Sequence, residues 1–281
     1  MRDRLASARR VLAENPLDLV ALGFFSLLVL CAALGPCIAP YDPLATDTTI
    51  ALQAPSLAHW FGADQLGRDI FSRVVVATRL DLFIAFAAVV LSGVVGSVIG
   101  AAIGYHRGFA DASVSRVVDV LMAFPLFVLA MSTVAALGNT IMNVIYATAI
   151  INLPFYIRLA RAETNIRRGL GYVEAARVGG SSHARILFVC LLPNILPALV
   201  VQASLNLGWA VLNAAGLSFI GLGVRAPTPE WGIMVADGAQ FITSRQWWIA
   251  LFPGLALMLA VFSFNLIGDG LRDIVDPRSR T

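Results

Sequence analysis

The chain has 281 residues, of which 58% are hydrophobic and 13% charged, and its mean hydropathy is +0.80. A soluble domain of this size would need far more polar surface, so the composition excludes that class and indicates an integral membrane protein. The formal net charge of +3 is too small to suggest nucleic-acid binding.

Six apolar stretches are long enough, or nearly so, to cross a bilayer as helices of about 20 residues. They cover residues 19–39, 82–104, 117–137, 141–157, 195–220 and 247–268. The first follows an Arg-rich terminus, but its length and the five later spans favour an uncleaved helix over a signal peptide. The fourth is the shortest and contains Asn143, Asn152 and Pro154, which a kinked helix inside a bundle would accommodate. The sequence therefore predicts an all-α, polytopic membrane protein.

Every basic residue is an arginine, and the arginines predict the orientation of the chain. If residues 1–18 are a cytoplasmic segment, the arginines expected outside are Arg68, Arg73, Arg79, Arg225 and Arg245. Those expected inside are Arg2, Arg4, Arg9, Arg10, Arg107, Arg116, Arg158, Arg161, Arg167, Arg168, Arg177, Arg185, Arg272, Arg278 and Arg280. This bias follows the positive-inside rule. We therefore expect the loop 158–194 and the C-terminal tail 269–281 to be cytoplasmic.

The absence of lysine limits the chemistry of the chain. A Walker A motif needs its lysine on the nucleotide phosphates, and a Schiff base needs a lysine amine. If ATP drives this protein, another chain must hydrolyse it.

Residues 40–81, between the first two spans, are expected to lie outside. Mostly apolar residues recur there with helical spacing, which predicts a short surface helix. They are Ile70, Phe71, Val74, Val75 and Thr78. Asp64 or Asp69 would cap the first turn of this helix.

The most informative segment runs from Glu174 to Pro193 and reads EAARVGGSSHARILFVCLLP. The adjacent Ala175 and Ala176 would let a short helix sink into a groove of a partner, because no atom beyond Cβ holds the backbones apart. Glu174 could offer its carboxylate to a partner's cation. Gly180 tolerates backbone angles closed to other residues, so the chain can turn there, and Pro193 suits the first turn of the next helix.

This segment resembles the coupling loop of ABC-importer permeases, whose pattern is E-A-A-x3-G-x9-I-x-L-P. Cys190 stands where the family usually has Ile, and a soft apolar side chain can replace Ile there. The alternative is an ordinary alanine-rich helix with a glycine cap, but the complete spacing favours the coupling loop. The resemblance assigns ATPase coupling to Glu174, Ala175, Ala176, Gly180, Leu192 and Pro193.

Three further segments resemble the dipeptide, oligopeptide and nickel branch of this family. They are Phe61–Leu82, Leu217–Gly238 and Trp247–Arg278, so the resemblance covers roughly residues 40–278. It implies the six-helix fold of a type I ABC-importer permease, with a five-helix core at 82–268. In the family, a substrate-binding protein docks on the outer face.

Residues 221–246 are expected to form an external loop, because glycines and prolines interrupt the apolar run there. Trp231, Trp247 and Trp248 bracket this loop. We expect them to anchor it at the membrane interface, as amphipathic rings do; contact with a ligand is the alternative.

Polar residues inside the predicted spans are few, and three of them share a helix face. Gln202, Asn206 and Asn213 are spaced by four and seven residues, which returns to the same side of a helix. Such side chains are costly in lipid unless they face protein or water. They either line the translocation path or join helices by hydrogen bonds.

The resemblance implies a non-catalytic permease subunit, without a cofactor of its own, that forms half of a pathway for di- or oligopeptides. Nickel or another small solute is the alternative cargo. The implied partners are a homologous second permease, two cytoplasmic ATPases that bind ATP and Mg²⁺, a periplasmic or lipid-anchored binding protein, and the lipid of the bacterial inner membrane.

A rival class is a channel or secondary transporter driven by an ion gradient. Such proteins usually carry charged relays within the membrane, and Asp119 is the obvious acid candidate here. A membrane-embedded enzyme would need a nucleophile, a base and a residue that orients them, and the sequence offers no plausible set of the three. The expected topology also separates His59 from His106 and His183, so the three cannot form one metal cluster.

Overall fold

The computed structural model describes residues 16–275, and every regular element in this range is a helix. The helices are α2 (Pro16–Ile38), η1 (Thr48–Ile50), α3 (Ile70–His106), α4 (Gly108–Ala123), α5 (Leu126–Leu137), α6 (Ile141–Arg167), α7 (Gly171–Val178), α8 (His183–Arg185), η2 (Ile186–Leu191), α9 (Leu192–Phe219), α10 (Trp231–Ala239) and α11 (Trp248–Val275). The predictions for Arg2, Arg4, Arg9, Arg10, Arg278 and Arg280 fall outside the described residues.

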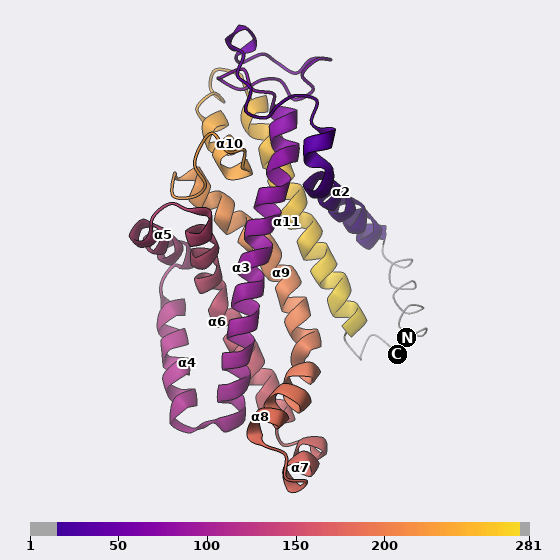
Figure 1. The fold of residues 1–281 in the computed structure, drawn as a ribbon, viewed down its shortest axis with the longest axis vertical. Helices are drawn as coiled ribbons and strands as arrows, with labels where there is room; N and C mark the ends of the chain where they lie inside the picture. The colour runs from indigo at the N-terminus through magenta and orange to yellow at the C-terminus, as the bar shows by residue number, and fades with distance from the viewer. Residues whose placement is uncertain (1–15, 276–281) are drawn as a thin grey trace.

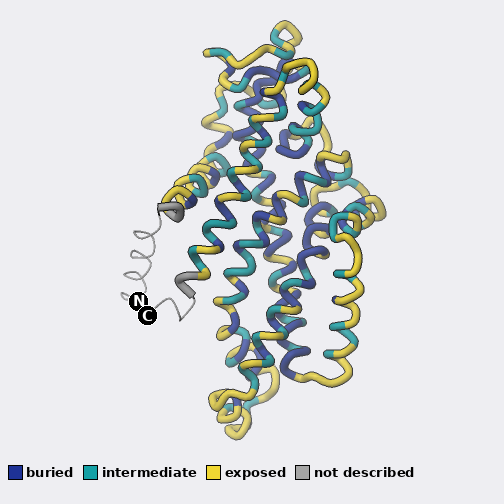
Figure 2. The backbone as a smooth tube through the Cα atoms, turned by 180° about the vertical axis from the view of Figure 1, so that it is seen from behind, coloured by how far each residue is buried: buried dark blue, intermediate teal, exposed yellow. Residues whose placement is uncertain are grey.

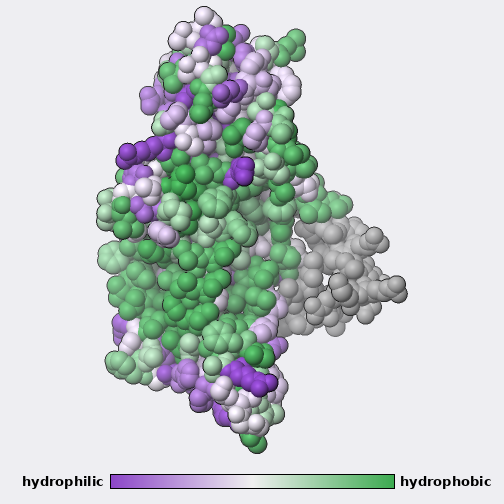
Figure 3. Space-filling model, viewed as in Figure 1, coloured by the Kyte–Doolittle hydropathy of each residue, from purple (hydrophilic) through white to green (hydrophobic). Residues whose placement is uncertain are grey.

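The long helices run between two different ends of the molecule (Figure 1). At one end lie residues 39–69 together with α10, here called the polar cap; at the other end lies α7. Figure 3 shows a broad hydrophobic belt between these ends, with hydrophilic residues gathered above and below it. This arrangement is that of a protein whose middle sits in lipid and whose two ends meet water.

Within residues 16–275, five helices are long and apolar enough to cross a membrane, and the pair α4–α5 makes a sixth if its two helices form one span. The prediction of an all-α polytopic fold is thus confirmed. A continuous helix over 117–137 is wrong, because α4 and α5 meet at an angle of 94°. Pro125 explains the bend: it has no N–H to donate, and it pushes Phe124 out of the helical region to φ −81° and ψ 146°.

The short surface helix predicted from Ile70 to Thr78 is not a separate element either. α3 begins at Ile70 and continues without a break through the predicted span 82–104 to His106. Asp69 caps it, since Oδ2 accepts the backbone N–H of Ser72 at 2.8 Å. Because a helix of 37 residues is about 55 Å long and the bilayer core about 30 Å thick, α3 extends well beyond the lipid.

Glycines bring α3 against α6 at the centre of the bundle, where buried residues concentrate (Figure 2). Gly96, Gly100 and Gly104 recur every four residues, and a Cβ at Gly100 would stand 2.4 Å from the carbonyl oxygen of Ile157. Small residues at this spacing let two membrane helices approach closely. Since α6 leads directly toward α7, this contact fixes the base of α7 relative to α3.

Candidate functional site

α7 projects from the end of the molecule opposite the polar cap (Figure 1). Val173 is fully buried and packs in the same hydrophobic cluster as Ile186 of η2, which holds the helix down. The opposite face is open: Glu174 and Ala175 are exposed, and Val178 is 90% exposed. An apolar side chain exposed this far, beside a free carboxylate and a bare alanine, offers a surface that a partner can cover.

Gly180 ends this helix through a Schellman motif. Its φ of +76° lies in the left-handed region that only glycine adopts at low cost. The N–H of Gly180 donates to the carbonyl of Arg177, and the N–H of Ser181 donates to the carbonyl of Ala176. Nothing lies within 4 Å of where a Cβ would stand, so backbone conformation and not space requires glycine here.

The six residues expected to couple to an ATPase do not lie on one surface. Glu174, Ala175 and Ala176 lie on α7, with Ala176 half-buried against the core, and Gly180 closes that helix. Leu192 and Pro193 instead form the first turn of α9 and line an apolar groove of about 480 Å³ between α3 and α9. These two residues therefore belong to the connection from α7 to the bundle and lie away from the exposed face of α7.

Gln202, Asn206 and Asn213 of α9 line one cavity of about 300 Å³ within the bundle. Asn152 of α6 and Asn265 of α11 line it too. The sequence marks both as polar residues within spans, but their meeting with α9 depends on how the helices pack. Five amide side chains from three helices therefore converge on one space.

Only some of the donors and acceptors of these amide side chains form hydrogen bonds within the protein. Nε2 of Gln202 donates to Oδ1 of Asn206 at 2.9 Å, and Nδ2 of Asn213 donates to the carbonyl of Trp209. Nδ2 of Asn206 is buried with no hydrogen-bond partner among the described residues. Asn206 thus has an N–H donor that no described protein group uses, at the wall of the cavity.

The polar cap holds a network of buried charges. Asp64 pairs with Arg68 at 2.6 Å and lies 3.7 Å from Arg73, and Arg68 lies 3.9 Å from Asp237. Asp69 also binds Nδ1 of His59 at 2.9 Å. The sequence offered Asp64 as one of two possible helix caps, but the structure gives that role to Asp69 and makes Asp64 the partner of two arginines.

Two tryptophans expected at the membrane interface are buried instead, Trp231 in this cap and Trp248 against it. Trp231 is fully buried and its Nε1 donates to the carbonyl of Val74 at 3.0 Å, while Trp248 is 8% exposed and its Nε1 donates to Ala63. Trp247 is 49% exposed. The anchoring prediction is thus wrong for Trp231 and Trp248: the N–H of Trp231 joins α10 to α3, and the N–H of Trp248 joins α11 to the cap.

The start of α10 is fastened by two carboxyl groups. Glu230 caps the helix, with its oxygens accepting the N–H groups of Gly232 and Ile233. Oδ2 of Asp81, in α3, accepts the N–H of Trp231 at 3.1 Å. Burial raises the pKa of Glu230, although the two backbone bonds act in the opposite direction.

The acid and the histidines considered in the sequence lie in separate places among the described residues. Asp119, the acid considered for an ion relay, pairs with Arg158 at 2.6 Å, and both side chains are about half exposed. His59 lies in the polar cap, whereas His106 and His183 lie together with ring centroids 5.6 Å apart. Residues 16–275 contain no group of three or more candidate ligands able to hold a metal ion.

Two family models match the chain. The model described as "Binding-protein-dependent transport system inner membrane component" matches residues 96–281, and the model of the N-terminal transmembrane domain of oligopeptide transport permease C matches residues 4–55. The first match includes α7, the amide-lined cavity and α10.

Curated relatives agree over nearly the whole length. A probable D,D-dipeptide transport permease of Escherichia coli, DdpC, is 42% identical over 96% of this chain and 90% of its own length. The dipeptide permease DppC of Alkalihalophilus pseudofirmus is 42% identical, covering 98% and 90%. The nickel permease NikC of Escherichia coli is 41% identical, covering 92% and 93%.

A solved structure shares the fold. It is an inward-facing form of the MetNI methionine ABC transporter, with a TM-score of 0.58 and 20% sequence identity, covering 72% of this chain and 96% of that chain. The similarity concerns the helical architecture.

Proposed function

Because the chain belongs to the family of binding-protein-dependent transport system inner membrane components, we propose that it is a permease subunit of an ATP-driven importer of di- or oligopeptides. It forms half of the translocation pathway, and a homologous second permease forms the other half. Two cytoplasmic ATPases bind ATP and Mg²⁺, and a periplasmic or lipid-anchored binding protein delivers the solute. The chain crosses the bacterial inner membrane several times, with both termini in the cytoplasm.

The exposed face of α7 is the observation that carries the coupling role. Glu174 and Ala175 stand clear of the bundle, while Val173 anchors the helix to it. A partner that binds α7 in a groove can therefore push on the bundle without unfolding α7. Movement of α7 tilts the helices attached to it and alternates access to the pathway.

The amide-lined cavity supports a peptide as the cargo. Amide side chains present both a donor and an acceptor, as the peptide group of a substrate does. The cavity contains five such side chains with the apolar Leu126, Ile151 and Leu205 beside them. Nickel or another small solute is the second candidate, because NikC is similar to this chain over nearly its full length.

The test uses the complete transporter reconstituted in proteoliposomes. The binding protein is added on the side of the bilayer that corresponds to the periplasm. We expect ATP-dependent uptake of radiolabelled trialanine, and loss of both uptake and ATPase binding in Ala175→Arg. The matched control is Ala112→Arg, which places the same side chain on the exposed face of α4. Full uptake and unchanged binding of the ATPases in Ala175→Arg would reject the coupling role. Uptake of ⁶³Ni²⁺ but not of trialanine would reject peptide as the cargo.

A further inference from the structure

One tyrosine at the end of α3 touches the chain before, within and after α7. The hydroxyl of Tyr105 lies 2.9 Å from Nδ1 of His183, which follows α7. The guanidinium of Arg177, in α7, lies 5.9 Å from the centre of the Tyr105 ring. The Tyr105 carbonyl accepts a hydrogen bond from Nη1 of Arg168, which precedes α7.

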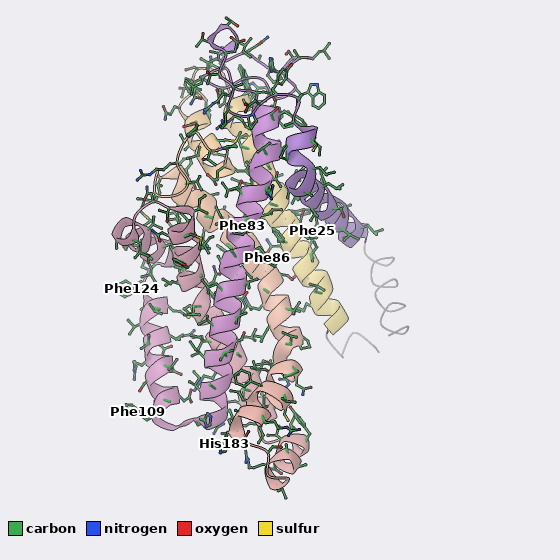
Figure 4. All side chains as sticks on the ribbon, viewed as in Figure 1. Phe25, Phe83, Phe86, Phe109, Phe124 and His183 are labelled. Carbon is green, nitrogen blue, oxygen red and sulfur yellow. The ribbon has the colours of Figure 1, made fainter. Side chains whose placement is uncertain are left out.

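Tyr105 itself is buried, although its partners Arg177 and His183 reach the surface. Tyr105 is 5% exposed and belongs to the hydrophobic cluster that includes Val173 and Ile186. Figure 4 places His183 at the α7 end of the molecule, close to where α3 ends. A hydrogen bond and a cation–aromatic contact to a buried ring hold the partners near it, each worth about 1 kcal/mol.

α3 is suited to carry a displacement from this point to the other end of the molecule. Its glycine face is packed tightly against α6, so it cannot bend easily there. Near its start, the carbonyl of Val74 and the carboxyl of Asp81 bind Trp231 of α10. One continuous helix thus connects the surroundings of α7 with the polar cap.

We propose that Tyr105 is a positioning residue that clamps α7 to α3, so that a displacement of α7 moves α3 and, through it, the polar cap. The proposal rests on the coupling role of α7 given above. Without the Tyr105 side chain, α7 keeps its anchor at Val173 but moves partly independently of α3. ATP hydrolysis then continues while less solute is moved for each ATP.

The test measures distance and coupling in the complete reconstituted transporter. Nitroxide labels are placed at Tyr172→Cys in α7 and Val94→Cys in α3, both exposed, in a background where Cys31, Cys37 and Cys190 are alanine. We expect a narrow distance distribution with and without ATP and vanadate in the parent protein, and a broadened one in Tyr105→Ala.

The second readout is the number of trialanine molecules imported per ATP hydrolysed. Tyr105→Phe keeps the ring and loses the hydroxyl, so we expect the ratio to fall about fivefold, the worth of one ordinary hydrogen bond. Tyr105→Ala should lower it further, on the order of twentyfold. Tyr146→Phe, at a half-exposed tyrosine of α6, is the matched control and should change neither readout.

The outcomes separate the two proposals. An unchanged distance distribution and an unchanged ratio in Tyr105→Ala, with Ala175→Arg still blocking ATPase binding, overturn the clamp and leave the coupling role standing. Normal ATPase binding and uptake in Ala175→Arg overturn the coupling role itself. If trialanine is not a substrate, the distance distributions decide the clamp by themselves.

Discussion

Nε of Arg68 lies 2.6 Å from Oδ2 of Asp64, and both side chains are almost completely buried. The same carboxylate lies 3.7 Å from Nε of Arg73 and accepts the backbone N–H groups of Leu66 and Arg68. One acidic residue therefore pairs with two buried guanidinium groups where the polar cap meets α3, and Asp237 lies 3.9 Å from Arg68 as a second carboxylate. Removing one member of such a group leaves uncompensated charge away from water.

Asp64→Asn should therefore lower the free energy of unfolding by about 3–5 kcal/mol, because two arginines lose their buried counter-charge. The measurement is the midpoint of thermal unfolding of the purified protein in detergent. Asp237→Asn is the matched control: Asp237 lies 3.9 Å from Arg68 and its side chain is 34% exposed, so its loss should cost less than about 1 kcal/mol. Equal shifts in the two variants would show that Asp64 is not the centre of the network.

Gly100→Ala should weaken the contact between α3 and α6. A Cβ at Gly100 would meet the Ile157 carbonyl oxygen at 2.4 Å and Ala160 Cβ at 2.9 Å, so the two backbones must separate. We expect a loss of about 1–3 kcal/mol, the usual range for overpacking. At Gly93 the nearest atom would lie at 3.5 Å, so Gly93→Ala should be tolerated in the same thermal assay. Comparable stability of the two variants would contradict close packing at Gly100.

The sequence predicts the family and the helical fold, and both are confirmed, because long apolar runs and a spaced motif are local signals. It does not predict where the helices bend or merge. Hydropathy averages composition over a window, so it places one helix over 117–137 although Pro125 marks the break. Periodicity finds a helix at 70–81, but no glycine or proline separates it from the following span, and the two form one helix.

The sequence likewise predicts some residues of the candidate site and misses others. The spacing of Gln202, Asn206 and Asn213 predicts a shared face on one helix, whereas the meeting with Asn152 and Asn265 depends on tertiary packing. The four-residue spacing of Gly96, Gly100 and Gly104 was available as a signal for a close helix contact. By contrast, no local pattern indicates that Tyr105 lies beside His183 or that Trp231 is buried against α3.

Gly180→Ala should loosen the end of α7 and lower the uptake of solute per ATP. The residue has a φ of +76°, which costs a non-glycine residue about 1–2 kcal/mol, so part of the population should lose the Schellman motif. Gly180→Val should have a larger effect, since a β-branched residue is poorer still in this region. Gly169→Ala is the control, because that position also has open space but no positive φ. Membrane abundance is measured alongside uptake. An unchanged uptake of solute per ATP in Gly180→Val would reject the coupling role of Gly180.

The double variant Gln202→Leu/Asn206→Leu separates a transport role of the amide cavity from a structural one. The two side chains bind each other, and Nδ2 of Asn206 has no partner among the described residues, so replacing both leaves neither amide stranded. If the amides serve only to join helices, the variant loses stability and transport together.

If they line the path, as we expect, thermal stability stays within about 1 kcal/mol of the parent or rises, because exchanging a bonded pair for apolar groups is nearly neutral. Trialanine uptake should nevertheless fall by at least about tenfold, since two amides that could bind the peptide group are gone. Ser132→Ala, which removes a polar group of α5 outside the cavity, should leave uptake unchanged. A double variant that is stable and transports normally would place the pathway elsewhere in the bundle.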